Sequence, residues 1–307
     1  MKQAHDTVNR LNAIPKWSNA VLHLILGFTA FTCIVPLLLI LSVSLTDERS
    51  VNLNGFRFWP DSFSLESYRY IFAYGYSVAN AYAISVFVTV TGTFLCVLLS
   101  AMYAYSISRS SFRFKKLFSF IAVFTLLYNG GLISFYIVCT RLFDMHNQLY
   151  ALILPYVVNA FNILIFRTYF LTNIHESVIE AAKIDGASEY SVFFRIVLRM
   201  SLPVLATVGL LTSITYWNDW MLSLLFIDKP GMFPLQYLLM RIENSVTAIQ
   251  SVAGAAGASY AQSQLDKLPV ESARMAMVII AVGPIALAYP FFQRFFIKGL
   301  NLGAVKG

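Results

Sequence analysis

Six apolar stretches dominate this chain. Each contains a run of at least 19 residues without a charged side chain, which as a helix is long enough to cross roughly 30 Å of hydrocarbon. Hydropathy places the expected spans at residues 21–45, 78–107, 117–139, 149–170, 203–226 and 275–296. The sequence therefore predicts an all-α, polytopic membrane protein with six transmembrane helices.

The composition excludes an ordinary soluble domain. Charged residues make up 12% of the 307 residues and hydrophobic residues 58%, whereas a typical soluble protein is about 25% charged. The first apolar run is too long for the core of a signal peptide. We therefore expect it to remain in the membrane as an anchor.

The distribution of Lys and Arg predicts the orientation. An even number of spans puts both chain ends on one side, and fourteen of the 22 Lys and Arg residues fall on that side. By the positive-inside rule that side is cytoplasmic. We expect a cytoplasmic segment at 1–20, a membrane domain at 21–296 and a cytoplasmic tail at 297–307, so that both the N- and the C-terminus are cytoplasmic. Topology thus accounts for the net charge of +7, and we expect contact with membrane lipid and no binding of nucleic acid.

Two long loops fall on the outer side, at 46–77 and 228–274. The first is rich in aromatic residues, and the second contains a run of Ala, Gly and Ser at 251–259 with a helix-compatible pattern. This run is either a solvated surface helix or an external lip that contacts a partner protein or cargo, since long non-random loops are often functional. The sequence leaves both interpretations open.

The cytoplasmic loop at 173–200 has the pattern of two helices joined by a turn. Asn173 with Glu176 can cap the start of the first helix, and Gly186 can end it. Ser188 is placed to cap a second helix with apolar residues at helical spacing, until Pro203 breaks it at the membrane. We expect a helix-turn-helix at the inner membrane face.

The turn of this loop combines acids with residues that have almost no side chain. These residues are Glu180, Ala181, Ala182, Asp185, Gly186 and Ala187. Small residues let another surface approach the backbone closely. A helix that merely rests in the lipid headgroups would carry Lys and Arg on its polar face instead. The pattern favours docking onto a partner.

These motifs resemble a known family. Glu180-Ala181-Ala182, Asp185-Gly186-Ala187 and then Phe194, Ile196, Leu198 and Pro203 resemble the EAA loop of binding-protein-dependent ABC importer permeases. Residues 217–220 (Trp-Asn-Asp-Trp) and the ending at 296–307 resemble its carbohydrate-uptake branch. Residues 128–133 before 152–155 narrow the resemblance to oligosaccharide and pectin-fragment permeases. Arg199 and Ser134 stand where the family commonly has Pro, which affects the exit of the loop and a kink in the third span.

The resemblance implies a transport subunit that works in a larger assembly. It implies a second permease subunit, a paralogue by the family pattern, two cytoplasmic ATP-binding subunits, an extracellular solute-binding protein and a bacterial plasma membrane location. The sequence has no GxxxxGK[ST] loop, so ATP and Mg are expected on the partner ATPase subunits. We expect no cofactor, metal or catalytic residue in this chain. The six residues of the turn would couple it to an ATPase.

A sugar path requires aromatic faces and hydrogen-bonding groups inside the membrane. The candidates are Asn159, Asn162, Trp217, Asn218 and Asp219. Asn159 and Asn162 could instead join helices by hydrogen bonds, and the tryptophans could be interfacial anchors. Asp219, a carboxylate near the outer end of a span, favours a functional role.

Two other functions compete with the importer. A self-sufficient ion-coupled secondary transporter would have internal repeats and ion sites near the bilayer centre, and a membrane-embedded enzyme would have clustered acids, His or metal ligands at one face. The sequence shows neither pattern. It places its clearest motif where a soluble partner can contact it.

Overall fold

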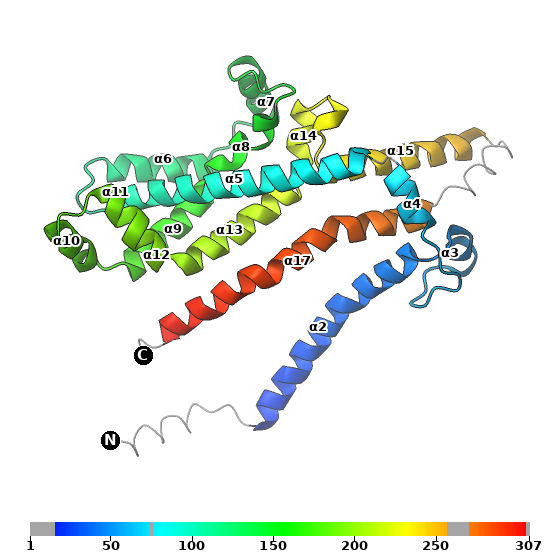
Figure 1. The fold of residues 1–307 in the computed structure, drawn as a ribbon, viewed down its shortest axis with the longest axis horizontal. Helices are drawn as coiled ribbons and strands as arrows, with labels where there is room; N and C mark the ends of the chain where they lie inside the picture. The colour runs from blue at the N-terminus through cyan, green and yellow to red at the C-terminus, as the bar shows by residue number, and fades with distance from the viewer. Residues whose placement is uncertain (1–15, 74–75, 257–269, 305–307) are drawn as a thin grey trace. The chain divides into compact units, whose positions relative to one another are not determined.

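The structure is a computed structural model that describes residues 16–73, 76–256 and 270–304. Within these residues the regular elements are helices, and the only β pairing is a single bridge between Thr46 and Phe63 (Figure 1). The predicted all-α class is therefore confirmed. The first 15 residues, residues 257–269 of the Ala/Gly/Ser-rich loop and residues 305–307 of the tail lie outside the described residues.

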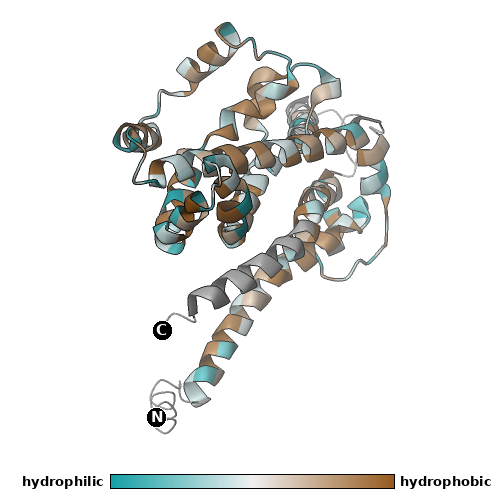
Figure 2. Cartoon of the chain, turned by 60° about the vertical axis from the view of Figure 1, so that its left-hand side comes forward, coloured by the Kyte–Doolittle hydropathy of each residue, from teal (hydrophilic) through white to brown (hydrophobic). Residues whose placement is uncertain are grey.

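Three helices are long and apolar enough to cross a membrane by themselves. They are α2 (Lys16–Ser44), α5 (Tyr76–Ser108) and α17 (Val270–Ala304). Up to six spans result if three bent pairs of shorter helices each count as one span. Figure 2 shows hydrophobic residues along much of α2, and many of its apolar side chains are exposed, including those of Leu24, Phe28 and Phe31.

The predicted third span is two helices at an angle of 118°. Helix α6 (Lys115–Leu127) ends at Tyr128, and α7 (Leu132–Arg141) begins after Gly131. Gly131 has φ of +82°, which favours glycine, and its N–H donates to the side chain of Asn129. The bend thus comes from Asn129, Gly130 and Gly131, ahead of the position of Ser134 where the family pattern placed a kink.

The predicted fourth and fifth spans are also interrupted. A 3-10 turn (Leu149–Leu152) and α8 (Leu154–Val157) meet α9 (Ala160–Asn173) at 44°, where Pro155 removes a backbone donor and the side chain of Asn159 caps α9. The fifth span divides into α13 (Leu202–Trp217) and α14 (Met221–Phe226). Hydropathy averaged over a whole span does not detect these breaks, because each is short and lies between apolar segments.

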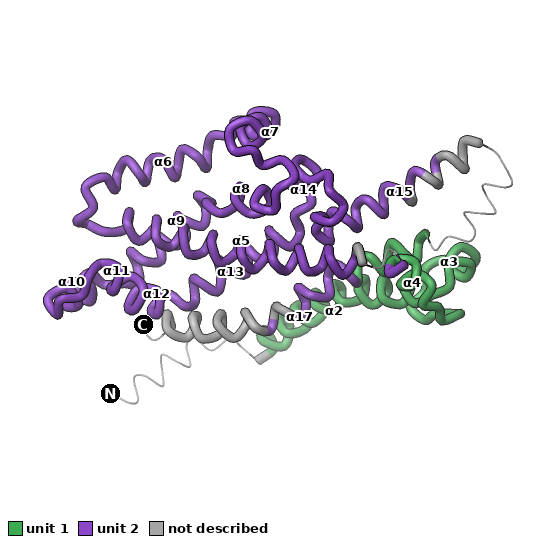
Figure 3. Tube along the Cα trace, turned by 45° about the horizontal axis from the view of Figure 1, so that its top comes forward, with its two compact units in different colours: residues 1–71, 253–279 green, residues 72–252, 280–307 purple. Residues whose placement is uncertain are grey.

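The chain forms two compact units, shown in Figure 3. The first contains α2, α3 (Glu48–Asn54), α4 (Glu66–Ala73) and the beginning of α17, up to Ile279. Buried Glu48 accepts hydrogen bonds from the N–H groups of Glu271 and Ser272 and from the Ser272 hydroxyl at 2.7–3.0 Å. The predicted outer loop at 46–77 is therefore tied to the start of the last helix.

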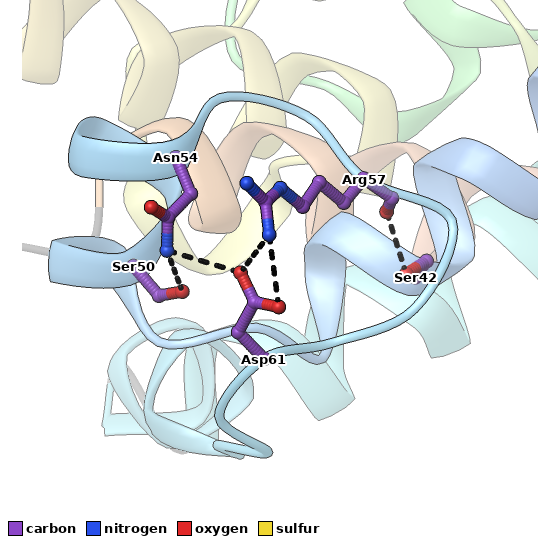
Figure 4. Close-up of polar contacts among 5 residues, drawn as sticks. All are labelled: Ser42, Ser50, Asn54, Arg57 and Asp61. Atoms are coloured by element: carbon purple, nitrogen blue, oxygen red, sulfur yellow. Dashed lines mark hydrogen bonds and ion pairs between the residues drawn. The ribbon is translucent and has the colours of Figure 1, made fainter.

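A polar cluster organises the same loop (Figure 4). Nη1 of Arg57 lies 3.2 and 3.1 Å from the two carboxylate oxygens of Asp61, and Asn54 donates to that carboxylate at 3.0 Å. The carbonyl of Arg57 accepts from Ser42 at the end of α2. These contacts give the loop a defined conformation.

The second unit is built on α5, which packs along α9 and α13. Its core contains fully buried Ala101, Phe166, Val192 and Val208. The other predicted outer loop begins in this unit with α15 (Leu235–Ala256), a helix of 22 residues. The small-residue run is thus helical as far as Ala256.

Candidate coupling loop and substrate path

The first helix of the cytoplasmic loop begins at a different residue from the one predicted. Asn173 does not cap it, because Asn173 is the last residue of α9 and its amide donates to the Tyr169 carbonyl and the Thr172 hydroxyl. Helix α10 (Glu176–Ile184) has His175 at its N-cap, without a side-chain hydrogen bond. The carboxylate of Glu176 is used elsewhere, in contacts with Ser110 and Arg109.

The turn after α10 is a Schellman motif centred on Gly186. The Gly186 N–H donates to the Lys183 carbonyl at 3.0 Å, and the Ala187 N–H donates to the Ala182 carbonyl at 2.9 Å. Gly186 has φ of +83°, and a Cβ placed there would meet no atom within 4 Å. The predicted helix end at Gly186 is confirmed, and the turn leaves the backbone uncovered on its outer side.

The second helix of the loop contains a π-helical turn. Ser188 caps it by accepting from the Ser191 N–H, as predicted. The helix runs through α11 (Glu189–Ser191), the π-helix η2 (Val192–Val197) and α12 (Leu198–Met200). It breaks at Ser201, just before Pro203, and the chain enters α13 at an angle of 81°.

One face of the loop is packed into the core of its unit, and the other face is exposed. Ile179, Ala182, Val192 and Phe193 are buried in the cluster that contains Phe166. The residues that face outward are Glu180, Ala181, Asp185 and Gly186, with Ala187 half-buried. Of the six predicted coupling residues, Ala182 is therefore buried in the core and Ala187 packs partly against it.

Sequence reasoning missed two large side chains beside the turn. Ile184 is 86% exposed and Tyr190 is 74% exposed. Ile184 lies off the stripe formed by Ile179 and Ala182, which are three positions apart and buried. The helical spacing could have predicted this exposure, because an apolar residue that falls off the buried stripe of a short amphipathic helix faces outward.

The loop is joined to the end of α5 at two places. The Tyr105 hydroxyl donates to Glu189, which also pairs with Lys183, and Glu176 contacts Ser110 and Arg109. Burial would raise the pKa of the Glu189 carboxyl, but hydrogen bonds from Lys183 and Tyr105 and nearby positive charge outweigh burial and lower it. Glu189 is therefore held ionised at the base of the loop.

The two asparagines of the fourth span have different partners. Asn159 is exposed, and its side-chain oxygen accepts from the N–H groups of Phe161 and Asn162. Asn162 is buried and donates to the Thr212 hydroxyl at 3.1 Å and to the Cys96 sulfur at 3.5 Å. Asn162 thus joins α9 to α13 and α5, as in the alternative interpretation.

The residues at the end of α13 form a hydrogen-bonded break in the helix. Trp217 is buried and donates to the Ala281 carbonyl at 2.9 Å. Asn218 donates back to the Ile214 carbonyl. Asp219 accepts from the Tyr156 hydroxyl at 3.0 Å and from the N–H of Leu222 at 3.2 Å. Asp219 therefore joins α8 to the first turn of α14.

A cavity of about 430 Å³ lies beside Trp217, between α5, α13 and α17. Thr89, Thr93 and Ser213 line it, together with apolar side chains. The hydroxyl oxygens of Thr89 and Thr93 are buried and have no hydrogen-bond partner among the described residues. The sequence did not single out these threonines, because isolated hydroxyls are common in apolar helices.

The chain resembles known proteins along most of its length. Residues 97–301 match the model of the family described as "Binding-protein-dependent transport system inner membrane component". The polygalacturonan/rhamnogalacturonan transport system permease protein YtcP of Bacillus subtilis is 37% identical over 92% of this chain and 97% of its own length. Protein LplC of the same organism is 33% identical over 92% and 93%.

A solved structure has the same fold. It is that of a bacterial ABC transporter involved in the import of the acidic polysaccharide alginate, with a TM-score of 0.77, 25% identity and coverage of 91% of this chain and 96% of that one. Long apolar helices, bent helix pairs and an exposed two-helix loop define a membrane transport subunit. This chain belongs to the family of inner membrane components of binding-protein-dependent transport systems.

Proposed function

We propose that this chain is the permease subunit of an ATP-driven ABC importer that carries a sugar oligomer across the bacterial plasma membrane. The observation that carries the proposal is the turn at Gly186. One face of the loop is buried in the core and fixes its position, while the backbone at Gly186 and the acidic side chains of Glu180 and Asp185 are exposed. The family and the named transport role of YtcP support it.

The proposed topology has six spans with both chain ends and the coupling loop in the cytoplasm. Three long helices and the two bent pairs at 115–141 and 149–173 support five spans, and α13 with α14 would form the remaining one. The cation distribution supports the orientation. In a cysteine-free background, a membrane-impermeant maleimide added to intact cells should label Leu53→Cys in the outer loop. It should label Ser177→Cys in α10 only after the membrane is opened. The reverse pattern would invert the topology.

The turn is proposed to dock in a groove of a cytoplasmic ATPase subunit. Glu180, Ala181, Asp185 and Gly186 would meet that surface, with Ile184 as an apolar anchor. Closure of two ATPase subunits around ATP and Mg would move the loop as a rigid body. Because the inner face of the loop is part of the core around Phe166, its movement would be passed to the membrane helices. A second permease subunit, a paralogue, would complete the path.

A pull-down tests the docking. Ala181→Glu adds bulk and charge to the outer face of α10, and Thr172→Glu makes the same addition at an exposed residue of α9 away from the turn. After mild detergent extraction, the wild type and Thr172→Glu should retain an ATPase subunit and a second permease, whereas Ala181→Glu should lose the ATPase. Failure of the wild type to retain any ATPase would favour an ion-coupled secondary transporter.

The substrate path is proposed to pass the cavity beside Trp217. Trp217 and the unpartnered hydroxyls of Thr89 and Thr93 are buried here, so a sugar ring would stack on the indole and pair with the hydroxyls only after α5, α13 and α17 move apart during transport. Asn159, Asn218 and Asp219 would lie along the same route, with Asn162 as its structural support. An extracellular solute-binding protein would deliver the sugar to its outer end.

The substrate class is proposed to be an acidic oligosaccharide. Polygalacturonan and alginate, in the names of two similar proteins, are both polymers of uronic acids. Purified complex in proteoliposomes, supplied with its binding protein and ATP, should take up radiolabelled trigalacturonate and should discriminate against a neutral trisaccharide. Preference for the neutral sugar would reject the acidic class and leave the importer assignment intact.

A further inference from the structure

A polar cavity lies at the base of the coupling loop, apart from the turn and from the cavity beside Trp217. It has a volume of about 300 Å³ and is formed where α5 ends, α6 begins, α9 ends and α10 begins. Its charged and titratable lining residues are Tyr105, Arg109, Lys115, His175 and Glu176. The proposed transport cycle does not use this cavity.

Arg109 is buried in this cavity, and one of its hydrogen-bond donors has no acceptor among the described residues. It exposes only 9% of its surface. Its Nη2 lies 4.0 Å from Glu176 and its guanidinium lies over the ring of Tyr105 at 5.9 Å, but its Nε is buried and has no hydrogen-bond partner among the described residues. A buried charged donor without a partner is costly, so this nitrogen indicates an acceptor absent from the isolated chain.

Two helix N-termini meet at the same cavity. Lys115 is the first residue of α6, and His175 is the N-cap of α10. Neither helix has a side-chain cap. The N–H groups of Lys115 and Val178 donate to the carbonyls of Phe112 and His175, and the other N–H groups of the two first turns are left for an anion. The carboxylate of Glu176 is engaged by Ser110 and Arg109. The cavity therefore combines basic side chains with two positive helix ends.

We propose that this cavity binds the phosphate of an anionic phospholipid. The acceptor that satisfies the buried guanidinium, the lysine and the helix ends is a phosphate group. Leu171 at the rim of the cavity is apolar and 54% exposed. An acyl chain attached to the phosphate can lie against this side chain, whereas a free phosphate would leave it uncovered.

The test compares neighbouring lysines. Lys115 lines the cavity, while Lys116 is exposed and does not, so Lys115→Gln and Lys116→Gln remove the same charge one residue apart. Full-length protein in neutral detergent is titrated with phosphatidylglycerol and with phosphatidylcholine of the same acyl chains, and bound lipid is counted by native mass spectrometry. Wild type should retain phosphatidylglycerol preferentially. Lys115→Gln should weaken its binding about fivefold and Lys116→Gln should not.

Arg109→Gln is a second test variant. It should weaken phosphatidylglycerol binding at least as much as Lys115→Gln does. Its result counts only if its thermal unfolding is cooperative, which shows that the variant is folded. Equal losses in Lys115→Gln and Lys116→Gln would overturn the proposal, because they would indicate general surface attraction. No preference over phosphatidylcholine would overturn it as well. Displacement of the lipid by millimolar inorganic phosphate would reject the lipid as the source of the phosphate.

Discussion

Tyr105, near the end of α5, donates a 2.7 Å hydrogen bond to Oε2 of Glu189, the first residue of the second loop helix. The two residues are 84 positions apart in the sequence. Phe193, one helical turn beyond Glu189, packs on the same tyrosine with ring centroids 5.3 Å apart. The loop at 173–200 and α5 are thereby linked through polar and apolar contacts.

Replacing Tyr105 with Phe should weaken coupling between the loop and the membrane helices. The change keeps the ring and removes a hydrogen bond to a charged group, a contact worth about 1.5–3 kcal/mol when well ordered. In the reconstituted complex, sugar transported per ATP hydrolysed should fall while hydrolysis continues. Tyr103→Phe is the matched control, because the Tyr103 hydroxyl donates to a carbonyl of α6 and not to the loop. Equal transport ratios in both variants would contradict the role of Tyr105.

The stabilising contribution of Glu189 should depend on pH. Its folded-state pKa is lowered, because the contacts with Lys183 and Tyr105 outweigh burial, so the contribution is present above the unfolded pKa of about 4.3. It is lost as pH falls through the folded-state pKa. The difference in melting temperature between wild type and Glu189→Gln should be constant near neutral pH and should shrink only in acid. A difference that grows in acid would have the wrong sign.

Gly186→Ala should strain the turn without filling any occupied space. A left-handed backbone conformation costs an L-residue about 1–2 kcal/mol, and at φ of +83° no atom lies within 4 Å of the added Cβ. Thermal stability should fall by about that amount. Gly130→Ala provides the control, since its Cβ is equally free of contacts and its φ is not in the strained range. An unchanged melting temperature for Gly186→Ala would argue against the Schellman turn.

Gly92→Ala should disturb the packing of α5 on α13. A Cβ at this position would lie 2.4–2.7 Å from the ring of Tyr216. That ring has little freedom to move, because it is buried and its hydroxyl donates to the Ile153 carbonyl at 2.8 Å. Overpacking of this kind costs about 1–3 kcal/mol. Gly27→Ala in α2, where the Cβ meets nothing within 4 Å, should not lower the melting temperature, because Ala favours the helix more than Gly does.

Asn162 and Thr212 should be energetically coupled. Their hydrogen bond of 3.1 Å is buried between α9 and α13, and such bonds inside membrane proteins average about 0.6 kcal/mol. A double-mutant cycle with Asn162→Leu and Thr212→Val, read from unfolding in detergent, should give a coupling energy of that order. Additive effects of the two substitutions would show that the amide contributes through another partner.

Sequence patterns predicted the helical class and most of the coupling loop for identifiable physical reasons. Gly186 and Ser188 act within one turn of the backbone, so their roles can be recognised locally. The cap at Asn173 was wrong because α9 continues through that residue, and the length of a helix depends on its packing. The breaks at Gly131 and Asn218 are only a few residues long and lie between apolar helices, so a hydropathy average over the span reveals neither the break nor the change of helix direction.

Long-range contacts were beyond sequence reasoning. The sequence around Tyr105 and Arg109 does not predict that they contact the loop at 173–200. The sequence around Thr89 does not predict a cavity beside Trp217. These contacts exist because α5, α9 and α13 pack together. No local pattern in a single sequence shows which helices will be neighbours. The exposure of Ile184, by contrast, could have been predicted from the sequence, because Ile184 does not fall on the buried stripe of α10 that contains Ile179 and Ala182.

The π-helix at Val192–Val197 also bears on how such a chain tolerates change in length. A π-turn holds one residue more than the α-turn on which it is built, so deletion of a single residue there would restore ordinary helical hydrogen bonding without opening the backbone. A deletion in a regular α-helix turns everything beyond it by about 100°, whereas the wide π-turn holds its extra residue locally. This stretch is therefore where the second loop helix could lose a residue while the entry into α13 keeps its orientation relative to the turn at Gly186.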